Sequence, residues 1–340
     1  MVTRQEVEGI LDHVMVPQVK RSVNEMNLLR NVETEDGKLK VTLSKSAISP
    51  EFQTRLADEV TDVLKGCNGG SVVKVDYELL KPVEVNRIEH VIAVMSGKGG
   101  VGKSLITGLL ALALAREGNN VGILDADITG PSIPKMFGLK TQSSGSETGI
   151  LPVVSRTGIE IMSMNLLLPN EDDAVIWRGP LIARCINQFW GDVLWGKLDY
   201  LVIDLPPGTA DVPLTVMKSL PLSGVIIAFT PQDLTAMVVR KAVKMAKQLN
   251  IPILGVVENM SYYLIPETGR KIDIFGPSRG NEMAKICGAP LLGQIPLDPE
   301  LAKLCDEGMI ESYHIESTGI FRQSVITELL TGHMAGAVVA

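Results

Sequence analysis

A glycine-rich stretch with two lysines has the clearest chemical meaning in this chain of 340 residues. Residues Gly97 to Ser104 read GKGGVGKS and satisfy the pattern GxxxxGK(S/T). Glycine leaves the backbone free to turn its N–H groups inward, and the N-terminus of a following helix attracts an anion. In such a loop Lys103 neutralises the β- and γ-phosphates, and Ser104 places its hydroxyl on Mg²⁺. The pattern therefore predicts a site for ATP and Mg²⁺.

Lys98 is the second lysine of this stretch. A lysine among glycines gains nothing from packing, and at this position it can reach a second phosphate. The alternative interpretation is a solvated surface lysine. The predicted nucleotide contacts in this region are Gly97, Lys98, Gly99, Gly100, Val101, Gly102, Lys103, Ser104 and Leu105.

A metal–nucleotide site also needs carboxylates near Mg²⁺ and the attacking water. Asp204 ends the apolar run 200–203 and precedes a loop that contains Gly208, which is the Walker B arrangement. We expect Asp204 to hold the Mg²⁺ shell and the backbone N–H of Gly208 to contact the γ-phosphate. The alternative role for Asp204 is to cap the next helix.

Two further carboxylates, Asp125 and Asp127, follow the apolar run 121–124. If the strand continues through them, they point to opposite faces and have different roles. We expect Asp127 to orient or activate the hydrolytic water and Asp125 to support the metal; the alternative is that both cap the following loop. The predicted catalytic residues are Lys98, Lys103, Asp127 and Asp204, and the predicted Mg²⁺ ligands are Ser104, Asp125 and Asp204.

Short apolar runs separated by helical stretches organise the chain after His90. The runs are continuous rather than alternating, which indicates strands covered on both faces. Strands that alternate with helices predict a doubly wound, mostly parallel sheet of the α/β class, with ligands beyond the carboxyl ends of the strands. The predicted strands are Val91–Met95, Val121–Leu124, Ile159–Met164, Tyr200–Ile203, Val225–Phe229, Ile253–Val257 and Leu291–Ile295.

The beginning of the chain predicts a separate small α/β unit. Apolar residues have helical spacing over 7–14 and 52–64, and they alternate with polar residues over 39–43 and 73–77. Little periodicity follows around Pro82. The predicted domains are a small α/β domain at 1–80, a linker at 81–90 and a P-loop ATPase domain at 91–340.

Composition argues against several classes of function. A net charge of −7 and an aromatic content of 4% disfavour a nucleic-acid or anionic-membrane surface. The N-terminal stretch lacks the order of a secretory signal, and the apolar stretches are too short to span a bilayer, so we expect a cytoplasmic protein. The spacing of the cysteines fits neither a disulfide framework nor a zinc site and indicates reduced core residues; they are Cys67, Cys185, Cys287 and Cys305.

Longer motifs narrow the interpretation. The loop at 97–104 resembles the deviant Walker A loop of MinD, ParA and nitrogenase iron-protein relatives. Together with the sequences DADITGPSIPKMFG at 125–138, WRGP at 177–180, DYLVIDLPPGTAD at 199–211 and ENMS at 258–261, it resembles the Mrp/ApbC iron–sulfur cluster carrier ATPases. This resemblance runs from about 90 to 308. The N-terminal unit resembles, more weakly, the small iron–sulfur-assembly domain often fused ahead of this ATPase.

The resemblance implies a homodimer with two ATP molecules at its interface. Lys98 is then expected to reach the partner's phosphates, as an arginine finger does. Asn259 matches the position that recognises adenine. Arg178 lies in a family motif, with helix capping as the alternative role. Partners implied by the family are iron–sulfur assembly or client proteins.

One departure from the family concerns its cargo. Members typically carry Cys-Pro-x-Cys after ENMS, and these cysteines hold a [4Fe–4S] cluster that bridges the dimer. Here Ile265 and Thr268 occupy the two cysteine positions, and neither side chain supplies a thiolate. Cys287 and Cys305 are candidate replacements, although their separation forms no local chelate.

Three functions remain open on the sequence. The leading one is an ATP-hydrolysing member of the carrier family that acts in iron–sulfur protein maturation, with direct cluster binding in doubt. The second is a MinD- or ParA-like switch in which ATP dimerises the protein; the amphipathic stretch 320–330 contains Arg322 as its only base, which favours core packing over membrane binding. The third is a nucleotide-binding scaffold without turnover.

Overall fold

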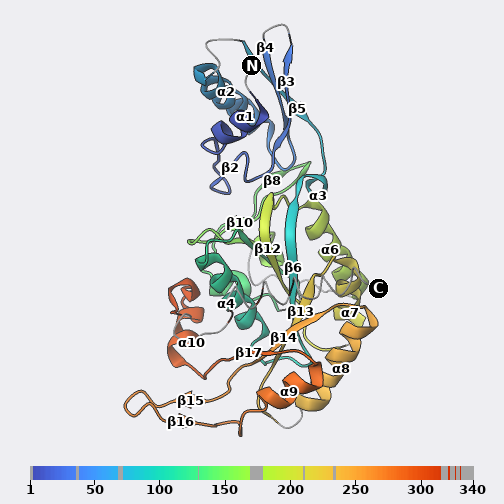
Figure 1. Ribbon diagram of the computed structural model, residues 1–340, viewed down its shortest axis with the longest axis vertical. Helices are drawn as coiled ribbons and strands as arrows, with labels where there is room; N and C mark the ends of the chain where they lie inside the picture. Colours follow the sequence, from blue (N-terminus) through green and yellow to red (C-terminus); the bar gives the residue numbers. More distant parts are fainter. Residues whose placement is uncertain are drawn as a thin grey trace. The chain divides into compact units, whose positions relative to one another are not determined.

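The computed structural model describes residues 3–35, 38–67, 72–128, 130–168, 179–209, 211–232 and 235–314, together with 321, 326 and 330. The chain divides into two compact units, and neither is continuous in sequence (Figure 1). The first contains 1–88, 142–154 and 188–198, and the second contains 89–141, 155–187 and 199–340. The first unit thus extends beyond the predicted 1–80, because two later segments pack with it.

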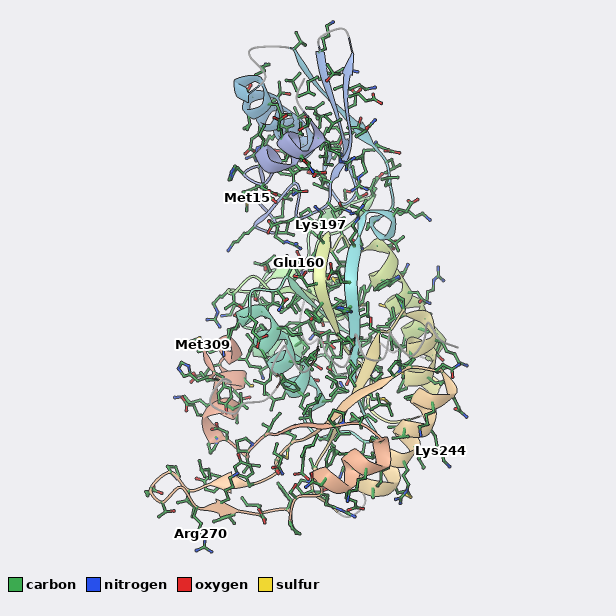
Figure 2. All side chains as sticks on the ribbon, in the orientation of Figure 1. Met15, Glu160, Lys197, Lys244, Arg270 and Met309 are labelled. Carbon is green, nitrogen blue, oxygen red and sulfur yellow. The ribbon has the colours of Figure 1, made fainter. Side chains whose placement is uncertain are left out.

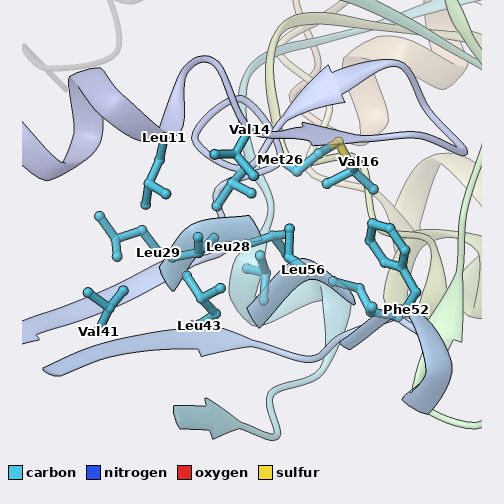
Figure 3. Close-up of a cluster of buried hydrophobic side chains, with 14 of the residues drawn as sticks. Leu11, Val14, Val16, Met26, Leu28, Leu29, Val41, Leu43, Phe52 and Leu56 are labelled. Atoms are coloured by element: carbon cyan, nitrogen blue, oxygen red, sulfur yellow. The ribbon is translucent and has the colours of Figure 1, made fainter. Parts of the chain in front are cut away.

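The first unit is a three-stranded sheet covered on one face by two helices. The strands β3 (Leu29–Glu35), β4 (Lys38–Ser44) and β5 (Val73–Glu78) lie in the order β3-β4-β5. Strands β3 and β4 are antiparallel, and β4 and β5 are parallel. Helices α1 (Arg4–Leu11) and α2 (Pro50–Cys67) bury Leu11 and Leu56 against sheet residues such as Leu43 (Figure 3).

Four predicted elements of this unit are present, and the longest of the strands that were not predicted is β3. Strand β3 has Val32 as its one aliphatic side chain after Leu29, so it shows no apolar alternation. It forms because its backbone pairs with β4. The region 81–90, predicted as a linker, contains helix α3 (Pro82–Val85) and the start of β6 at Arg87. Short antiparallel pairs complete the unit: β1 (Met15–Val16) with β2 (Arg21–Ser22), and β8 (Gly145–Ser146) with β9 (Gly149–Ile150).

A large, mostly parallel sheet contains most of the strands of the second unit. Its order is β10-β11-β7-β12-β6-β13-β14-β17. The pairings β11–β7, β12–β7, β13–β6, β13–β14 and β14–β17 are all parallel. The strand bounds are β6 (Arg87–Ser96), β7 (Val121–Asp125), β10 (Val153–Val154), β11 (Glu160–Met162), β12 (Lys197–Asp204), β13 (Gly224–Phe229), β14 (Ile253–Glu258) and β17 (Leu291–Gln294). Every predicted strand is present, and β10 is additional.

Helices lie on both sides of this sheet, as the continuous apolar strands predict. Every residue of β7, β13 and β14 is buried. Figure 1 shows α4 and α10 to one side of the strands and α6, α7 and α8 to the other. The helices are α4 (Lys103–Arg116), α5 (Ile133–Met136), α6 (Gly179–Asp192), α7 (Asp211–Ser219), α8 (Thr235–Gln248), α9 (Gly280–Cys287) and α10 (Pro299–Asp306), with 3-10 turns at Met164–Leu166 and Ile310–Ser312. The predicted doubly wound α/β fold is confirmed.

The strand order brings separate motifs to one edge of the sheet. Because β6, β7, β12, β13 and β14 run parallel, their carboxyl ends meet there. Asp204 at the end of β12 is the register partner of Asp125 at the end of β7. Among the described residues, no helix is both long and apolar enough to cross a membrane.

Candidate nucleotide-binding site

The glycine-rich loop joins the end of β6 to the start of α4, as its pattern predicts. Gly100 and Gly102 have φ angles of +78° and +80°, a left-handed conformation that other residues rarely adopt. Gly97 has no room for a side chain, because a Cβ there would lie 1.7 Å from Cγ1 of Val238. A Cβ on Gly102 would lie 2.1 Å from Nδ2 of Asn259. These glycines are therefore required by backbone conformation and packing.

The loop encloses a cavity of about 290 Å³ at the carboxyl edge of the sheet. Asp127 lines this cavity together with the loop, as expected of two motifs that belong to one site. Ser132, Met136 and Pro207 also line it and were not predicted, although all three lie inside the quoted motifs. The lining residues are Ser96, Lys98, Gly99, Gly100, Val101, Gly102, Lys103, Ser104, Leu105, Asp127, Ser132, Met136 and Pro207.

Lys103 and Asp204 form the charged centre of the site. Nζ of Lys103 lies 2.7 Å from Oδ1 of Asp204, and their side chains are 5% and 0% exposed. Oγ of Ser104 donates a 2.5 Å hydrogen bond to Oδ2 of Asp204. Carboxylate and hydroxyl oxygens are the ligands that Mg²⁺ prefers, so these two side chains fit the predicted metal.

The two carboxylates after β7 have different surroundings, as predicted. Oδ2 of Asp127 lies 3.5 Å from Nζ of Lys103, beside the cavity. Asp125 is fully buried: its Oδ1 accepts from the backbone N–H of Asp127 at 3.2 Å, and its Oδ2 accepts from Oγ of Ser163 at 3.2 Å and from the N–H of Ile133 at 3.4 Å. Asp125 thus holds the Asp127 loop in place and is not among the residues that line the cavity.

Burial, and after it the neighbouring charge of Asp204, raise the pKa of Asp125 to about 8. The ammonium of Lys103 acts in the opposite direction. In this arrangement Asp125 is better suited to support its neighbours than to bind a cation directly.

Three other predicted residues make contacts within the chain. Nζ of Lys98 donates to Oε1 of Gln232 at 2.7 Å. The N–H of Gly208, expected to contact the γ-phosphate, donates instead to the carbonyl oxygen of Ser96 at 3.0 Å. Nδ2 of Asn259, expected to contact adenine, donates to the carbonyl oxygen of Val101 at 2.9 Å. Each of the three lies at the phosphate loop or directly beside it.

Glu258 is a positioning residue to which the sequence analysis assigned no role. Its buried carboxylate accepts from Oγ of Ser261 at 2.6 Å, from Oγ of Ser278 at 2.6 Å, from Nε2 of Gln294 at 2.9 Å and from the N–H of Arg279 at 2.7 Å. These bonds connect the end of β14 to the loop before α9 and to β17. They hold the turn that carries Asn259. The sequence feature that could have indicated this role is a charged residue, Glu258, at the end of the otherwise apolar strand β14.

Comparisons with known proteins agree with this geometry. A family model described as NUBPL iron-transfer P-loop NTPase matches residues 87–329, well over half of the chain. The chain belongs to this family. A second model, described as iron–sulfur cluster assembly protein, matches residues 4–77, which confirms the resemblance of the N-terminal unit. The predicted family membership is therefore confirmed for both parts.

Individual relatives support the same assignment. An iron–sulfur cluster carrier protein from Synechocystis sp. is 37% identical over 322 residues, 91% of each chain. One from Methanocaldococcus jannaschii is 49% identical over 227 residues, which are 66% of this chain and 78% of the relative. A nucleotide-binding protein from Archaeoglobus fulgidus, solved in complex with ADP, is 48% identical with a TM-score of 0.61, covering 67% of this chain and 89% of that one.

The positions at which the family resemblance expects cysteines lie in a hairpin. Strands β15 (Tyr263–Leu264) and β16 (Lys271–Ile272) are antiparallel, and Ile265 and Thr268 lie in the turn between them. The N–H groups of Thr268 and Gly269 donate to the carbonyl oxygen of Ile265 at 3.3 and 2.9 Å. Figure 2 shows Arg270 near the outer end of this hairpin. The turn is thus formed without thiolates.

The described cysteines lie on three different helices, α6, α9 and α10. Cys185 and Cys287 are buried, Cys305 is half-buried, and all three are free thiols. Burial raises the pKa of each thiol to about 11, which disfavours the thiolate that binds iron. Within the described ranges, no group of three or more His, Cys, Asp and Glu side chains is arranged to hold a metal ion. Arg178, the remaining motif residue, lies outside the described residues.

Proposed function

We propose that the chain binds ATP with Mg²⁺, hydrolyses ATP, and uses this cycle in the maturation of iron–sulfur proteins. The observation that carries the proposal is the contact of Lys103 with both Asp204 and Asp127 beside the loop cavity. The ammonium of Lys103 thus connects Asp204, the residue expected at the metal, to Asp127, the residue expected at the attacking water. A glycine-rich turn without a ligand has no need for this arrangement.

The proposed mechanism assigns one task to each side chain. Lys103 moves from Asp204 to the β- and γ-phosphates, and the loop N–H groups hold the phosphate oxygens. Ser104 and Asp204 would hold Mg²⁺, which would neutralise charge on the transferring phosphoryl group. Asp127 orients the attacking water and accepts its proton. Asp125 keeps Asp127 in position through the bond to its N–H.

Lys98 and the homodimer form the next part of the proposal. Lys98 lies at the rim of the cavity with its ammonium on Gln232. In a dimer with two ATP molecules it would exchange Gln232 for the phosphates of the partner's nucleotide, as an arginine finger does in trans. Asn259 and Gly208 are proposed to contact adenine and the γ-phosphate only after they leave their present acceptors. A cytoplasmic location remains a prediction of the sequence.

Asp127→Asn tests the proposed mechanism. If Asp127 acts as the base, the variant loses about 10²- to 10⁴-fold in the rate of phosphate release while its affinity for ATP stays close to that of the unmodified chain. Phosphate release and binding of a fluorescent ATP analogue measure the two quantities. Asp306→Asn, an exposed change on α10, is the matched control. Hydrolysis by Asp127→Asn at the full rate would contradict the assignment.

A second candidate is an ATP-dependent dimerisation switch without cluster chemistry. Ile265 and Thr268 favour it, because the hairpin offers no thiolate where the family resemblance expects two. In this case ATP dimerises the protein, and a partner protein triggers hydrolysis. Anaerobic reconstitution with iron and sulfide separates the candidates. A thiolate-to-iron absorption band supports direct carriage of a cluster, and a flat spectrum rules out direct carriage.

A further inference from the structure

We propose that Thr107 is a positioning residue that holds Asp204 in the orientation required for Mg²⁺; this rests on the proposed function of the nucleotide site. Thr107 lies on α4, one turn after Lys103. Its Oγ1 is 2.9 Å from Oδ1 of Asp204 and 3.1 Å from the carbonyl oxygen of Lys103. A hydroxyl group has one proton, and the carboxylate is the stronger of these two acceptors.

Thr107 places a hydroxyl group in an otherwise apolar, buried part of α4. Every residue from Ile106 to Leu114 is buried, and Thr107 is the one polar side chain among them. A buried hydroxyl destabilises a protein unless it forms hydrogen bonds. Its bond to Asp204 meets this requirement and also connects α4 directly to the end of β12.

The two oxygens of Asp204 face different partners. Oδ2 accepts from Ser104, the predicted Mg²⁺ ligand, at 2.5 Å. Oδ1 is held by Lys103 at 2.7 Å and by Thr107 at 2.9 Å. The Oδ1 contacts therefore orient the carboxylate so that Oδ2 is directed toward the expected metal position.

Nucleotide binding changes this set of donors. Lys103 is proposed to move to the phosphates, and its bond to Oδ1 then weakens or is lost. Thr107 is fixed by the helix backbone and remains on Oδ1. Asp204 is fully buried, so a carboxylate oxygen without that donor would be poorly solvated. Thr107 thus becomes important in the nucleotide-bound state, when the orientation of Asp204 matters for the metal.

The test compares Thr107→Val with Thr107→Ser in the full chain. Affinity for a fluorescent ADP analogue is measured with excess Mg²⁺ and with EDTA, so the readout is binding and not hydrolysis. Loss of a group that orients a metal ligand typically lowers metal affinity about 10- to 100-fold. We expect the gain in ADP affinity on adding Mg²⁺ to be about tenfold smaller for Thr107→Val than for the unmodified chain. In EDTA, the affinity of Thr107→Val for ADP should equal that of the unmodified chain. Thr107→Ser, which retains the hydroxyl, should behave like the unmodified chain.

A control separates this effect from a general loss of stability. Thr148→Val in the first unit also removes a hydroxyl, one bonded to the carbonyl oxygen of Lys45 and to the N–H of Ala47 at 3.1 Å each. It should leave the Mg²⁺ effect unchanged. If Thr107→Val does not fold, Thr107→Ala is the second variant without the hydroxyl.

Two results would overturn the proposal. One is a gain in ADP affinity on adding Mg²⁺ that is as large in the variants without the hydroxyl as in the unmodified chain. The other is a reduction of this gain in Thr107→Ser that equals the reduction in Thr107→Val. Absence of Mg²⁺-dependent tightening in the unmodified chain would also overturn it. Absence of ATP hydrolysis with normal Mg²⁺-dependent binding would contradict the proposed function and leave the role of Thr107 supported.

Discussion

The ammonium of Lys103 lies 2.7 Å from Oδ1 of Asp204, and both side chains are buried. Ionised groups withdrawn from water are tolerated when they are paired, so each side chain depends on the other. In the proposed function the phosphates of ATP replace Asp204 as the partner of Lys103. The carboxylate therefore holds the lysine at the loop before nucleotide binds, and the phosphates must compete with it.

Lys103→Met is expected to lower stability and to abolish tight ATP binding. The change leaves Asp204 as a buried charge without its cation, and removal of one partner of a buried pair typically costs about 3–5 kcal/mol. Urea unfolding and nucleotide titration measure the two effects. Lys303→Met is the control, because the Lys303 side chain is 72% exposed and its Nζ lies 3.8 Å from Oε1 of Glu307. An exposed pair of this kind contributes at most about 1 kcal/mol. Equal stability losses in the two variants would contradict the role of the buried pair.

Lys98→Ala is expected to lower the ATPase rate by about 10³-fold if Lys98 acts in trans like an arginine finger. Mixing this variant with Asp127→Asn gives a sharper result. In a mixed dimer, the site with an intact Asp127 receives Lys98 from its partner, so the mixture should regain activity that neither variant has alone. Lys140→Ala, which changes an exposed lysine, should have no effect. Failure of the mixture to recover activity would exclude the trans arrangement.

Glu311 is expected to contribute stability at neutral pH and to lose this contribution in acid. Burial by itself raises the pKa of Glu311, but hydrogen bonds from Thr157, Ser155 and Arg156 outweigh it and hold the pKa below its ordinary 4.5. Since the folded-state pKa is the lower one, the stabilisation is complete above 4.5 and disappears as the pH falls through the lowered pKa.

Glu311→Gln tests this expectation. It should lower the free energy of unfolding by about 1–3 kcal/mol at neutral pH, because it weakens buried hydrogen bonds to a charge. The difference from the unmodified chain should shrink with acidification. Urea unfolding at several pH values measures it. Glu307→Gln, whose side chain is 53% exposed, is the matched control and should have little effect. A constant difference at every pH would rule out titration of Glu311 as the cause.

Cysteines at the two hairpin positions are expected to create cluster binding. Ile265, which is half-buried, and Thr268, which is exposed, lie in one turn, and iron–sulfur clusters are held mainly by thiolates. Ile265→Cys with Thr268→Cys should therefore produce a thiolate-to-iron absorption band after anaerobic reconstitution, whereas the unmodified chain should not. Ile265→Cys alone is the control, because it supplies half of the thiolates. A strong band from the unmodified chain would show that other ligands hold a cluster.

Most of the sheet was predictable from local pattern. Continuous apolar runs predicted the strands of the second unit, because residues buried on both faces leave no alternation. Strand β3 was missed for the opposite reason: apart from Val32, its residues after Leu29 are mainly polar, and pairing with β4 stabilises it. The packing of residues 142–154 within the first unit could not be predicted from local sequence pattern either, because it depends on contacts between residues distant in sequence.

The same division applies to the site. The loop, Asp127 and Asp204 were found from residue type and spacing, because phosphate and Mg²⁺ accept a narrow set of donors at the ends of strands. The contacts of Asp125 with Ser163 and of Lys98 with Gln232 had no such signal. A hydrogen bond between distant residues has no fixed spacing, so only the fold can bring its partners together.

The sequence by itself determined the phosphate loop, the α/β class, the family and the loss of the hairpin cysteines. Each of these depends on residue identity or on a short-range repeat. The tertiary structure decided which oxygen of Asp204 faces Ser104 and which faces Lys103 and Thr107. The strand order β7-β12-β6 brings the ends of separate strands beside the first turns of α4. Which donor bonds to which oxygen of Asp204 then depends on differences of a few ångströms in three dimensions, which the sequence does not specify.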